Sequence, residues 1–475
     1  MPNIEERQMQ RRSMLVDTPI SKLIPKMAVP TIVAMMITSI YSMADTYFVS
    51  FLGTAATAAV GVNFSIDQAI MMVGSFLAIG SNSYISRLLG AKNNDKASKT
   101  LSTAFFTALF LGLLVMVPGI LFTEKIVVFL GATPNATQYA VDYAKYILLA
   151  APFMTSSFVL NQCLRSEGSP VYSMIGMGVG GILNIILDPI FIFTLDMGVA
   201  GAAIATSISK LVGFIILIFP YVSKRSILRM SLKNISFSRD IVSETCLMGV
   251  PALLRMGLAV VASILLNKIA GEYSDSALAA VSVVSRIMML PTSAILGFSQ
   301  GFQPVAGYNW GARRYDRVKS TFRFSSYAGV IAIAIVSVLM AVFSEQIILL
   351  FANAEEIDAE MVRIGRFCLI TQCIVMPLNA WVIIVNFLYS ALGRPVGAII
   401  LGITRQGICF VPMVYILPHF FKIYGLASTQ AAADLLSFFI TVPFAIAIVR
   451  QIALKEREQP ALDEQRPAAE QALQQ

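Results

Sequence analysis

An amide and a carboxylate lie four residues apart inside the apolar stretch GGILNIILDPIFIF, which spans residues 180 to 193. If this stretch is a helix, the side chains of Asn184 and Asp188 share one face. Pro189 then removes a backbone donor and crowds the carbonyl of Ile185, so we expect a helix kink beside the carboxylate and free carbonyl oxygens there. Such a group of oxygen atoms suits a small cation or a proton.

Seven further ionisable residues are expected inside apolar segments. A charged side chain at the bilayer centre costs about 2.5 to 3.5 kcal/mol on insertion scales, so each is a functional candidate until it is paired. Two alternatives stay open for Asp188. It binds an ion, or it is the buried partner of Lys210 or Arg286 and serves packing alone. Asp45 by itself is typical of an interfacial residue. The seven residues are Asp45, Asp67 and Lys210 in the first half of the chain, and Arg255, Arg286, Arg405 and Asp434 in the second, where Asp67 and Asp434 are candidates to pair with bases.

The segments that hold these residues are typical of transmembrane helices. The chain is 57% hydrophobic and 13% charged, with a mean hydropathy of +0.74, whereas soluble domains average roughly 25% charged residues. The apolar runs approach the ~20 residues that a helix needs to cross a bilayer, which predicts an all-α integral membrane protein with twelve spans. The expected spans are residues 24–45, 57–84, 100–122, 138–163, 170–193, 198–222, 246–268, 277–303, 322–344, 361–390, 395–418 and 424–450.

Lysine and arginine residues collect in the loops on one side of this arrangement, and that side includes both ends of the chain. Because positive residues accumulate in cytoplasmic loops, we expect both termini in the cytoplasm. The net charge of +8 is explained by this asymmetry, and no nucleic-acid partner is needed to account for it.

An internal repeat divides the chain into two halves. At an offset of 221 residues, Val29-Pro30 recurs as Val250-Pro251, Gly80 as Gly301, and GAKNND at 90–95 as GARRYD at 311–316. A second register of 225 pairs Asn184 and Asp188 with Cys409 and Met413, so the second half holds no copy of the polar pair. Two parallel six-span lobes follow, because each half has an even number of spans. The expected divisions are a cytoplasmic segment 1–23, an N-lobe 24–222, a cytoplasmic linker 223–245, a C-lobe 246–450 and a disordered cytoplasmic tail 451–475.

The sequence lacks the residues that several classes of function require. The only histidine, His419, falls in a loop, which leaves no Ser-His-Asp triad and no histidine-based metal site. There is no GxxxxGK[ST] motif and no loop long enough for an ATPase domain. We therefore expect a protein that is not an enzyme, needs no cofactor and draws energy from an ion gradient. Two like lobes around a cleft favour a transporter over a scaffold or a channel.

Several strings resemble the multidrug and toxic compound extrusion (MATE) family, in its bacterial MepA-like and DinF-like branches. They are LNIILDPIFIF at 183–193, GVAGAAIATSIS at 198–209, SYISRLLGAK at 83–92 and SQGFQPVAGYNWGA at 299–312. The resemblance implies a V-shaped pair of six-helix lobes. It also implies an antiporter that exchanges H+ or Na+ for organic, often cationic, drug-like compounds. We also expect a location in the inner membrane of a bacterium and function as a monomer.

The resemblance also implies which residues bind the coupling ion. DinF-like members use an Asp in span one, the Asn and Asp of an N-x-x-x-D-P string in span five and a Thr in span six, which match Asp45, Asn184, Asp188 and Thr206 here. This changes the interpretation of Asp45, which now joins the site. The NorM-like branch uses an acid in span seven, where this chain offers Arg255 and no acid, so we expect coupling in the first lobe.

A lipid-linked oligosaccharide flippase of the same wider superfamily is the alternative function. Such proteins line their cavity with arginines that hold a pyrophosphate, and Arg255, Arg286 and Arg405 keep this alternative open.

Overall fold

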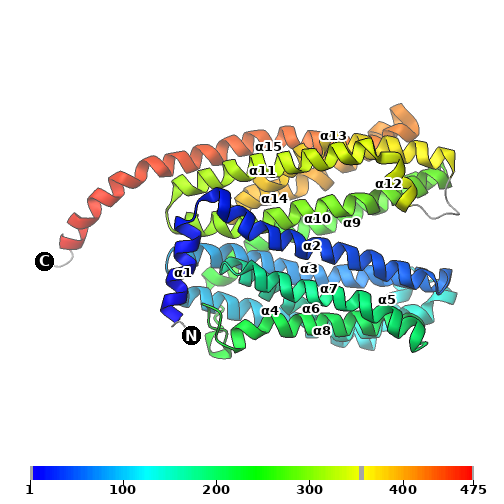
Figure 1. Cartoon of the computed structure of the whole chain (residues 1–475), viewed down its shortest axis with the longest axis horizontal. Helices are drawn as coiled ribbons and strands as arrows, with labels where there is room; N and C mark the ends of the chain where they lie inside the picture. The colour runs from blue at the N-terminus through cyan, green and yellow to red at the C-terminus, as the bar shows by residue number, and fades with distance from the viewer. Residues whose placement is uncertain (1–3, 352–357, 473–475) are drawn as a thin grey trace.

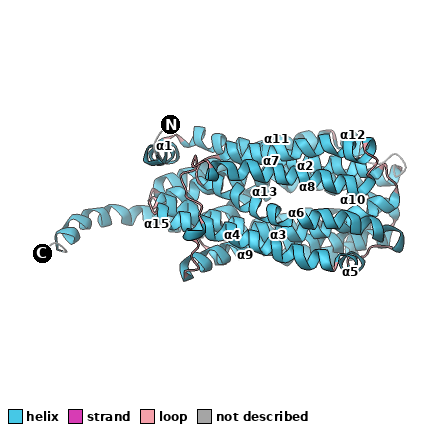
Figure 2. Cartoon of the chain, turned by 90° about the horizontal axis from the view of Figure 1, so that it is seen from below, coloured by secondary structure: helices cyan, strands magenta, loops and turns pink. Residues whose placement is uncertain are grey.

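The computed structural model describes residues 4–351 and 358–472, which form helices joined by short connections (Figures 1 and 2). No strand occurs within these two ranges. The elements of the first half are α1 (Ile4–Asp17), α2 (Ile20–Ser50), α3 (Thr54–Gly90), α4 (Asn94–Leu121), α5 (Thr123–Phe129), α6 (Pro134–Ser166), α7 (Pro170–Pro189), η1 (Ile190–Thr194) and α8 (Gly198–Val222). Those of the second half are η2 (Leu232–Asn234), α9 (Arg239–Tyr273), α10 (Asp275–Gly311), α11 (Tyr315–Val342), α12 (Ser344–Phe351), α13 (Ala359–Ala391), α14 (Pro395–Ile403), η3 (Thr404–Cys409) and α15 (Phe410–Ala472).

The described part of the chain holds twelve membrane spans, as predicted. Eleven helical stretches are long and apolar enough to cross a bilayer, and the last of them, Pro395–Gln459, holds two spans. The backbone of Lys422, with φ 50° and ψ −130°, interrupts the helix there. A β-carbon on Gly425 would lie 2.1 Å from the carbonyl oxygen of Leu417, so the chain doubles back at this point and only glycine fits.

The outer faces of the helices are apolar. On α11, the side chains of Tyr327, Ile331, Ile335 and Val338 are 58 to 62% exposed and follow one helical face. A continuous apolar stripe of this kind is costly in water but favourable against lipid tails. The chain is therefore a multi-pass membrane protein.

The helices run side by side along the long axis of the molecule, and both ends of the chain lie at the same end of the bundle (Figure 1). We call this end the terminal face. The first six spans, α2 to α8, form one lobe and the last six, α9 to α15, form the other. The predicted all-α fold of two parallel six-span lobes is confirmed.

Residues related by the repeat meet where the two lobes touch. Asn82 on α3 and Gln303 on α10 are repeat mates at the offset of 221, and the Asn82 amide donates to Gln303 Oε1 at 3.3 Å. A β-carbon on Gly90 would lie 2.0 Å from Tyr308 O, and one on its mate Gly311 would lie 2.0 Å from Arg87 O. Such reciprocal contacts are expected beside a two-fold axis between the lobes.

The hydrogen bonds between the lobes lie on one side of the membrane. The bond farthest from the terminal face joins Ser39 Oγ on α2 to Ser293 Oγ on α10 at 2.6 Å. The others in the described ranges lie between this pair and the terminal face. They include Arg165 Nη1 to Gln300 Oε1 at 2.5 Å and an ion pair of 2.6 Å between Arg87 and Glu244. The lobes are thus bonded to each other at the terminal face, and residues 4–351 and 358–472 form no such bonds in the other half of the bundle.

Helix α1 crosses the terminal face and contacts both lobes (Figure 1). Its Arg11 donates to the carbonyl of Gly168 in the first lobe at 2.7 Å. From the second lobe, the Asn309 amide donates to Leu15 O at 3.2 Å and Arg317 donates to Thr18 O at 2.6 Å, just beyond the helix. The N-terminal segment therefore ties the two lobes together.

The segment between the lobes is anchored by one buried acid. Glu167, which is 1% exposed and lies in the turn between α6 and α7, accepts hydrogen bonds from Ser226 Oγ at 2.6 Å and Ile227 N at 3.1 Å. Burial raises the pKa of Glu167 from 4.5 to about 7, although the hydrogen bonds from Ser226, Tyr221 and Ile227 oppose this.

The raised pKa of Glu167 predicts a pH-dependent stability. The folded protein binds this proton more tightly than the unfolded chain, so the contribution is favourable below pH 4.5, falls as the pH rises toward about 7, and stays lower above that. The full change is about 3 kcal/mol at about 1.4 kcal/mol per pKa unit. Thermal unfolding in detergent at about pH 5 and about pH 8 should show a smaller loss of stability for Glu167→Gln than for the wild type. An equal loss in both proteins would contradict the assignment.

The last helix extends into the segment for which a disordered tail is expected. Helix α15 continues to Ala472 and projects beyond the terminal face (Figure 1). This segment is rich in Ala, Glu and Gln, which have high helix propensity, and it follows directly from a long transmembrane helix. Residues 1–3 and 473–475 of the expected terminal segments lie outside the described residues.

Candidate ion-coupling site

Small residues bring three helices of the first lobe into close contact. On α7, a β-carbon at Gly181 would lie 2.7 Å from the Ile37 side chain and 3.0 Å from that of Tyr41, both on α2. On α8, a β-carbon at Gly213 would lie 2.9 Å from Gly176 O of α7. Helix α7 is therefore held tightly between α2 and α8, which carry the other predicted site residues.

Four predicted residues meet between these helices. The Asn184 amide on α7 donates to Asp188 Oδ1 at 3.0 Å and to Thr206 Oγ1 of α8 at 3.1 Å. Asn184 and Asp188 are 1% and 0% exposed, and the bond between them shows that they share one helix face. The carboxylate of Asp45 on α2 is close enough to Asp188 to interact with it electrostatically. We call Asp45, Asn184, Asp188 and Thr206 the acidic cluster.

Tyr143 is a neighbour that the sequence did not single out. Its hydroxyl, on α6, donates to Asp45 Oδ2 at 3.4 Å, and its side chain is buried. A tyrosine in an apolar span is most often a packing residue with one hydrogen bond, so its type alone carries no signal for this contact. Only the packing of α6 against the lobe brings it to Asp45.

Three oxygen atoms of the acidic cluster have no donor. Within the described ranges, Asp45 Oδ1, Asn184 Oδ1 and Asp188 Oδ2 are buried and accept no hydrogen bond. Buried acceptors without partners are costly, and native proteins keep few of them. Oxygen atoms of carboxylates and amides suit a proton or a hard cation such as Na+. The donor set therefore fits the expected coupling ions.

A transition-metal site does not fit these residues. The described part of the chain holds no group of three or more His, Cys, Asp or Glu side chains that could bind a metal ion. The acidic cluster contains two carboxylates, an amide and a hydroxyl, and none of the thiolate or imidazole ligands that zinc and copper sites use.

The helix geometry changes at Pro189, where a kink is expected. Helix α7 ends at this proline, and the chain continues as the π-helix η1 from Ile190 to Thr194. Proline cannot donate to the preceding turn, and π-helical turns occur often at functional sites. The change in geometry lies directly beside Asp188.

Lys210 and Asp67 flank the acidic cluster. The ammonium of Lys210, one turn beyond Thr206 on α8, donates to the Tyr41 hydroxyl at 2.5 Å and interacts electrostatically with Asp67 on α3 and with Asp45. Within the described ranges, Asp188 forms no ion pair with Lys210 or Arg286. The purely structural alternative for Asp188 therefore lacks its partner.

The predicted charges of the second lobe lie apart from the acidic cluster. Arg405, in the π-helix η3, pairs with both oxygens of Asp434 at 2.6 and 3.2 Å, and Gln430 donates to Asp434 at 2.9 Å. Arg255 stacks over the ring of Phe387, with 5.3 Å from its guanidinium carbon to the ring centre. Arg286 is exposed on α10. Of these four predicted charges, Arg405 and Asp434 neutralise each other, and Arg255 and Arg286 form no ion pair within the described ranges.

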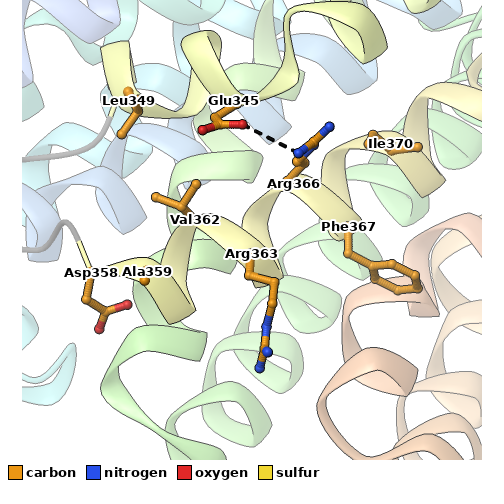
Figure 3. Close-up of a pocket in the computed structure, with 9 residues that line it drawn as sticks. All are labelled: Glu345, Leu349, Asp358, Ala359, Val362, Arg363, Arg366, Phe367 and Ile370. Carbon is orange, nitrogen blue, oxygen red and sulfur yellow. Dashed lines mark hydrogen bonds and ion pairs between the residues drawn. The ribbon is translucent and has the colours of Figure 1, made fainter.

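A hollow of about 690 Å³ opens at the end of the bundle opposite the termini, between α12 and α13 (Figure 3). The side chains around it include Arg363, Asp358 and an ion pair of 3.4 Å between Arg366 and Glu345. It contains none of the predicted site residues, and it lies in the other lobe from the acidic cluster.

Sequence and structure comparisons identify relatives of this chain. The model of the MatE family matches residues 30–190 and 251–416. The multidrug export protein MepA of Staphylococcus saprophyticus subsp. saprophyticus is 31% identical over 408 residues, covering 86% of this chain and 89% of the relative. The MepA protein of Staphylococcus haemolyticus is 29% identical over 427 residues, covering 90% and 93%.

Solved structures of the same family match the fold. A crystal structure of a MATE protein in complex with MaL6 superimposes with a TM-score of 0.88 at 25% identity, covering 93% of this chain and 99% of the other. An outward-facing multidrug resistance MATE family transporter of the MOP superfamily also gives 0.88 at 25% identity, covering 92% and 98%. Two matched segments that span both lobes, together with this agreement in fold, show that the chain belongs to the MATE family of membrane transporters.

Proposed function

We propose that this protein is a multidrug exporter that exchanges H+ or Na+ for organic, often cationic, drug-like compounds. The observation that carries the proposal is the acidic cluster, in which three buried oxygens lack donors inside one lobe of a duplicated transmembrane bundle. Drug export is supported by the names of the relatives, which are multidrug export proteins. No enzymatic step and no cofactor enter this function.

The proposed cycle depends on the charge of Asp45 and Asp188. An ion that enters from the side where the described residues form no hydrogen bonds between the lobes binds the carboxylates and removes one unit of their negative charge, so α2 packs more closely on α7 and the drug is released outward. Release of the ion on the other side restores the negative charge, which attracts the next lipophilic cation. The two conformations differ in their affinity for the ion, and this difference drives the cycle.

The orientation and the assembly belong to the same proposal. The terminal face is cytoplasmic in the inner membrane of a bacterium, because most lysines and arginines of the loops lie on that side. The conformation described here is then the outward-facing one. The protein works as a monomer in the lipid bilayer, since the acidic cluster is built from one lobe of one chain.

The flippase alternative has less support. Of its three arginines, Arg405 is bound by the two oxygens of Asp434, and a neutralised arginine is a poor pyrophosphate ligand. Arg255 and Arg286 remain as candidate ligands for a pyrophosphate.

Reconstitution of the full chain in liposomes tests the proposal. Ethidium efflux should start when a pH gradient or a sodium gradient is imposed in the absence of ATP, and it should stop when the gradients are collapsed. Liposomes without protein give the background. Efflux that ignores both gradients, or flipping of a fluorescent lipid-linked oligosaccharide with no ethidium transport, would refute the proposal.

A further inference from the structure

Lys210 is a cation held inside the membrane by a neutral partner. Its ammonium donates to the phenol of Tyr41 at 2.5 Å and lies 4.9 Å from the centre of the same ring. The side chain forms no salt bridge within the described ranges. A lysine at this depth is costly, so its charge is expected to serve the site beside it.

The neighbours of Lys210 are the groups of the proposed coupling site. Tyr41 and Lys210 lie one helical turn from Asp45 and Thr206 on α2 and α8, so the two pairs form adjacent layers between the same helices. Asp45 and, from α3, Asp67 interact electrostatically with the ammonium. Among the described residues, Tyr143 on α6 and Asp188 on α7 are the further titratable groups that interact with Asp45.

The resident ammonium affects a proton and a sodium ion differently. Its field weakens the binding of any further cation to the carboxylates. A proton has a high intrinsic affinity for a buried carboxylate, and it needs no shell of ligands because it forms one O–H bond. A sodium ion binds isolated carboxylates weakly and needs several oxygens, of which the acidic cluster leaves three without a donor. The repulsion from the Lys210 ammonium therefore leaves the proton bound to the carboxylates but prevents the weaker binding of a sodium ion.

We propose that Lys210 excludes sodium from the acidic cluster and thereby makes the proton the ion that this protein exchanges for drugs. The inference rests on the proposed antiport function and deepens it, because it assigns the choice of ion to one residue. The effect requires only a fixed positive charge at this position, so an arginine there keeps the selectivity and a neutral side chain removes it.

Transport by three proteins in liposomes tests the role of Lys210. For the wild type and for Lys210→Arg, a pH gradient should drive ethidium efflux, and a sodium gradient at equal pH should drive it at least about tenfold more slowly. For Lys210→Met, the sodium gradient should become effective, with a rise of about tenfold. Wild-type efflux driven by a sodium gradient alone would overturn the inference and leave the antiport function standing.

A second measurement decides the question if Lys210→Met does not transport. A ligand that binds the folded state raises its melting temperature, so thermal unfolding in detergent is compared in NaCl and in KCl. Lys210→Met should gain a sodium-specific stabilisation that the wild type and Lys210→Arg lack. Its absence from Lys210→Met would overturn the inference. Failure of the wild type to respond to either gradient would instead refute the antiport function, and the comparison of salts would still decide on Lys210.

Discussion

Asp188→Asn is expected to uncouple drug export from the ion gradient. Asparagine has nearly the same shape and still accepts a hydrogen bond from Asn184, but it carries no charge and binds no proton. One charge moved through a membrane potential of about 100 mV supplies about 2.3 kcal/mol. Losing it should lower the steady-state drug gradient roughly fiftyfold, since about 1.4 kcal/mol corresponds to a factor of ten.

The control for Asp188→Asn is a second acid in the same region of the chain. Asp196 follows the π-helix η1, is exposed, and has a positive φ of 52°, which asparagine tolerates well. Asp196→Asn therefore removes the same charge outside the acidic cluster and should pump like the wild type. Efflux is measured in everted vesicles with each gradient imposed separately. Normal pumping by Asp188→Asn under either gradient would rule out the acidic cluster as the coupling site.

Gly80→Ala is expected to prevent the lobes from closing at the terminal face. A β-carbon at this position of α3 would lie 2.0 Å from the carbonyl oxygen of Thr245 on α9 and 2.9 Å from its carbon. Both are backbone atoms of the other lobe, so only a separation of the lobes can relieve the overlap. Overpacking costs about 1 to 3 kcal/mol and sometimes more, which lowers the population of this conformation about 5- to 150-fold.

The repeat provides a second variant and the helix provides a control. At Gly301, the mate of Gly80, a β-carbon would lie 2.5 Å from Ala28 Cα, so Gly301→Ala should act in the same way. At Gly61, on the same helix as Gly80, nothing lies within 4 Å, so Gly61→Ala should be silent. Drug efflux and the distance between spin labels on the terminal ends of α3 and α9 are measured. Unchanged distances in Gly80→Ala and Gly301→Ala would contradict the expected closure.

The number of spans and the two lobes could be predicted because they depend on simple patterns. Apolar runs of span length mark the helices, and a fixed offset marks the repeat. The spacing of Asn184 and Asp188 also predicts a shared face, and the hydrogen bond of 3.0 Å between them confirms it. Each of these features is local in the sequence or repeated in it.

Other features depend on contacts between distant segments and had no local signal. Asp45 at the end of a helix has the pattern of an interfacial residue, and only the resemblance to a family placed it with Asp188. Tyr143 reaches Asp45 from another span, and Glu167 is bound by linker residues 59 and 60 positions away in sequence. Nothing in the composition of residues 4–17 indicates that α1 would bridge both lobes.

The hydrogen bond between the repeat mates Asn82 and Gln303, and the reciprocal contacts of Gly90 with Tyr308 and of Gly311 with Arg87, have a consequence for the origin of the chain. A surface on which each contact is repeated by the mates of its two residues is what a homodimer of a single half makes around a two-fold axis, where the same patch serves both partners. This seam is therefore the one that fusion of two copies of a symmetric pair of six-span halves leaves between the lobes.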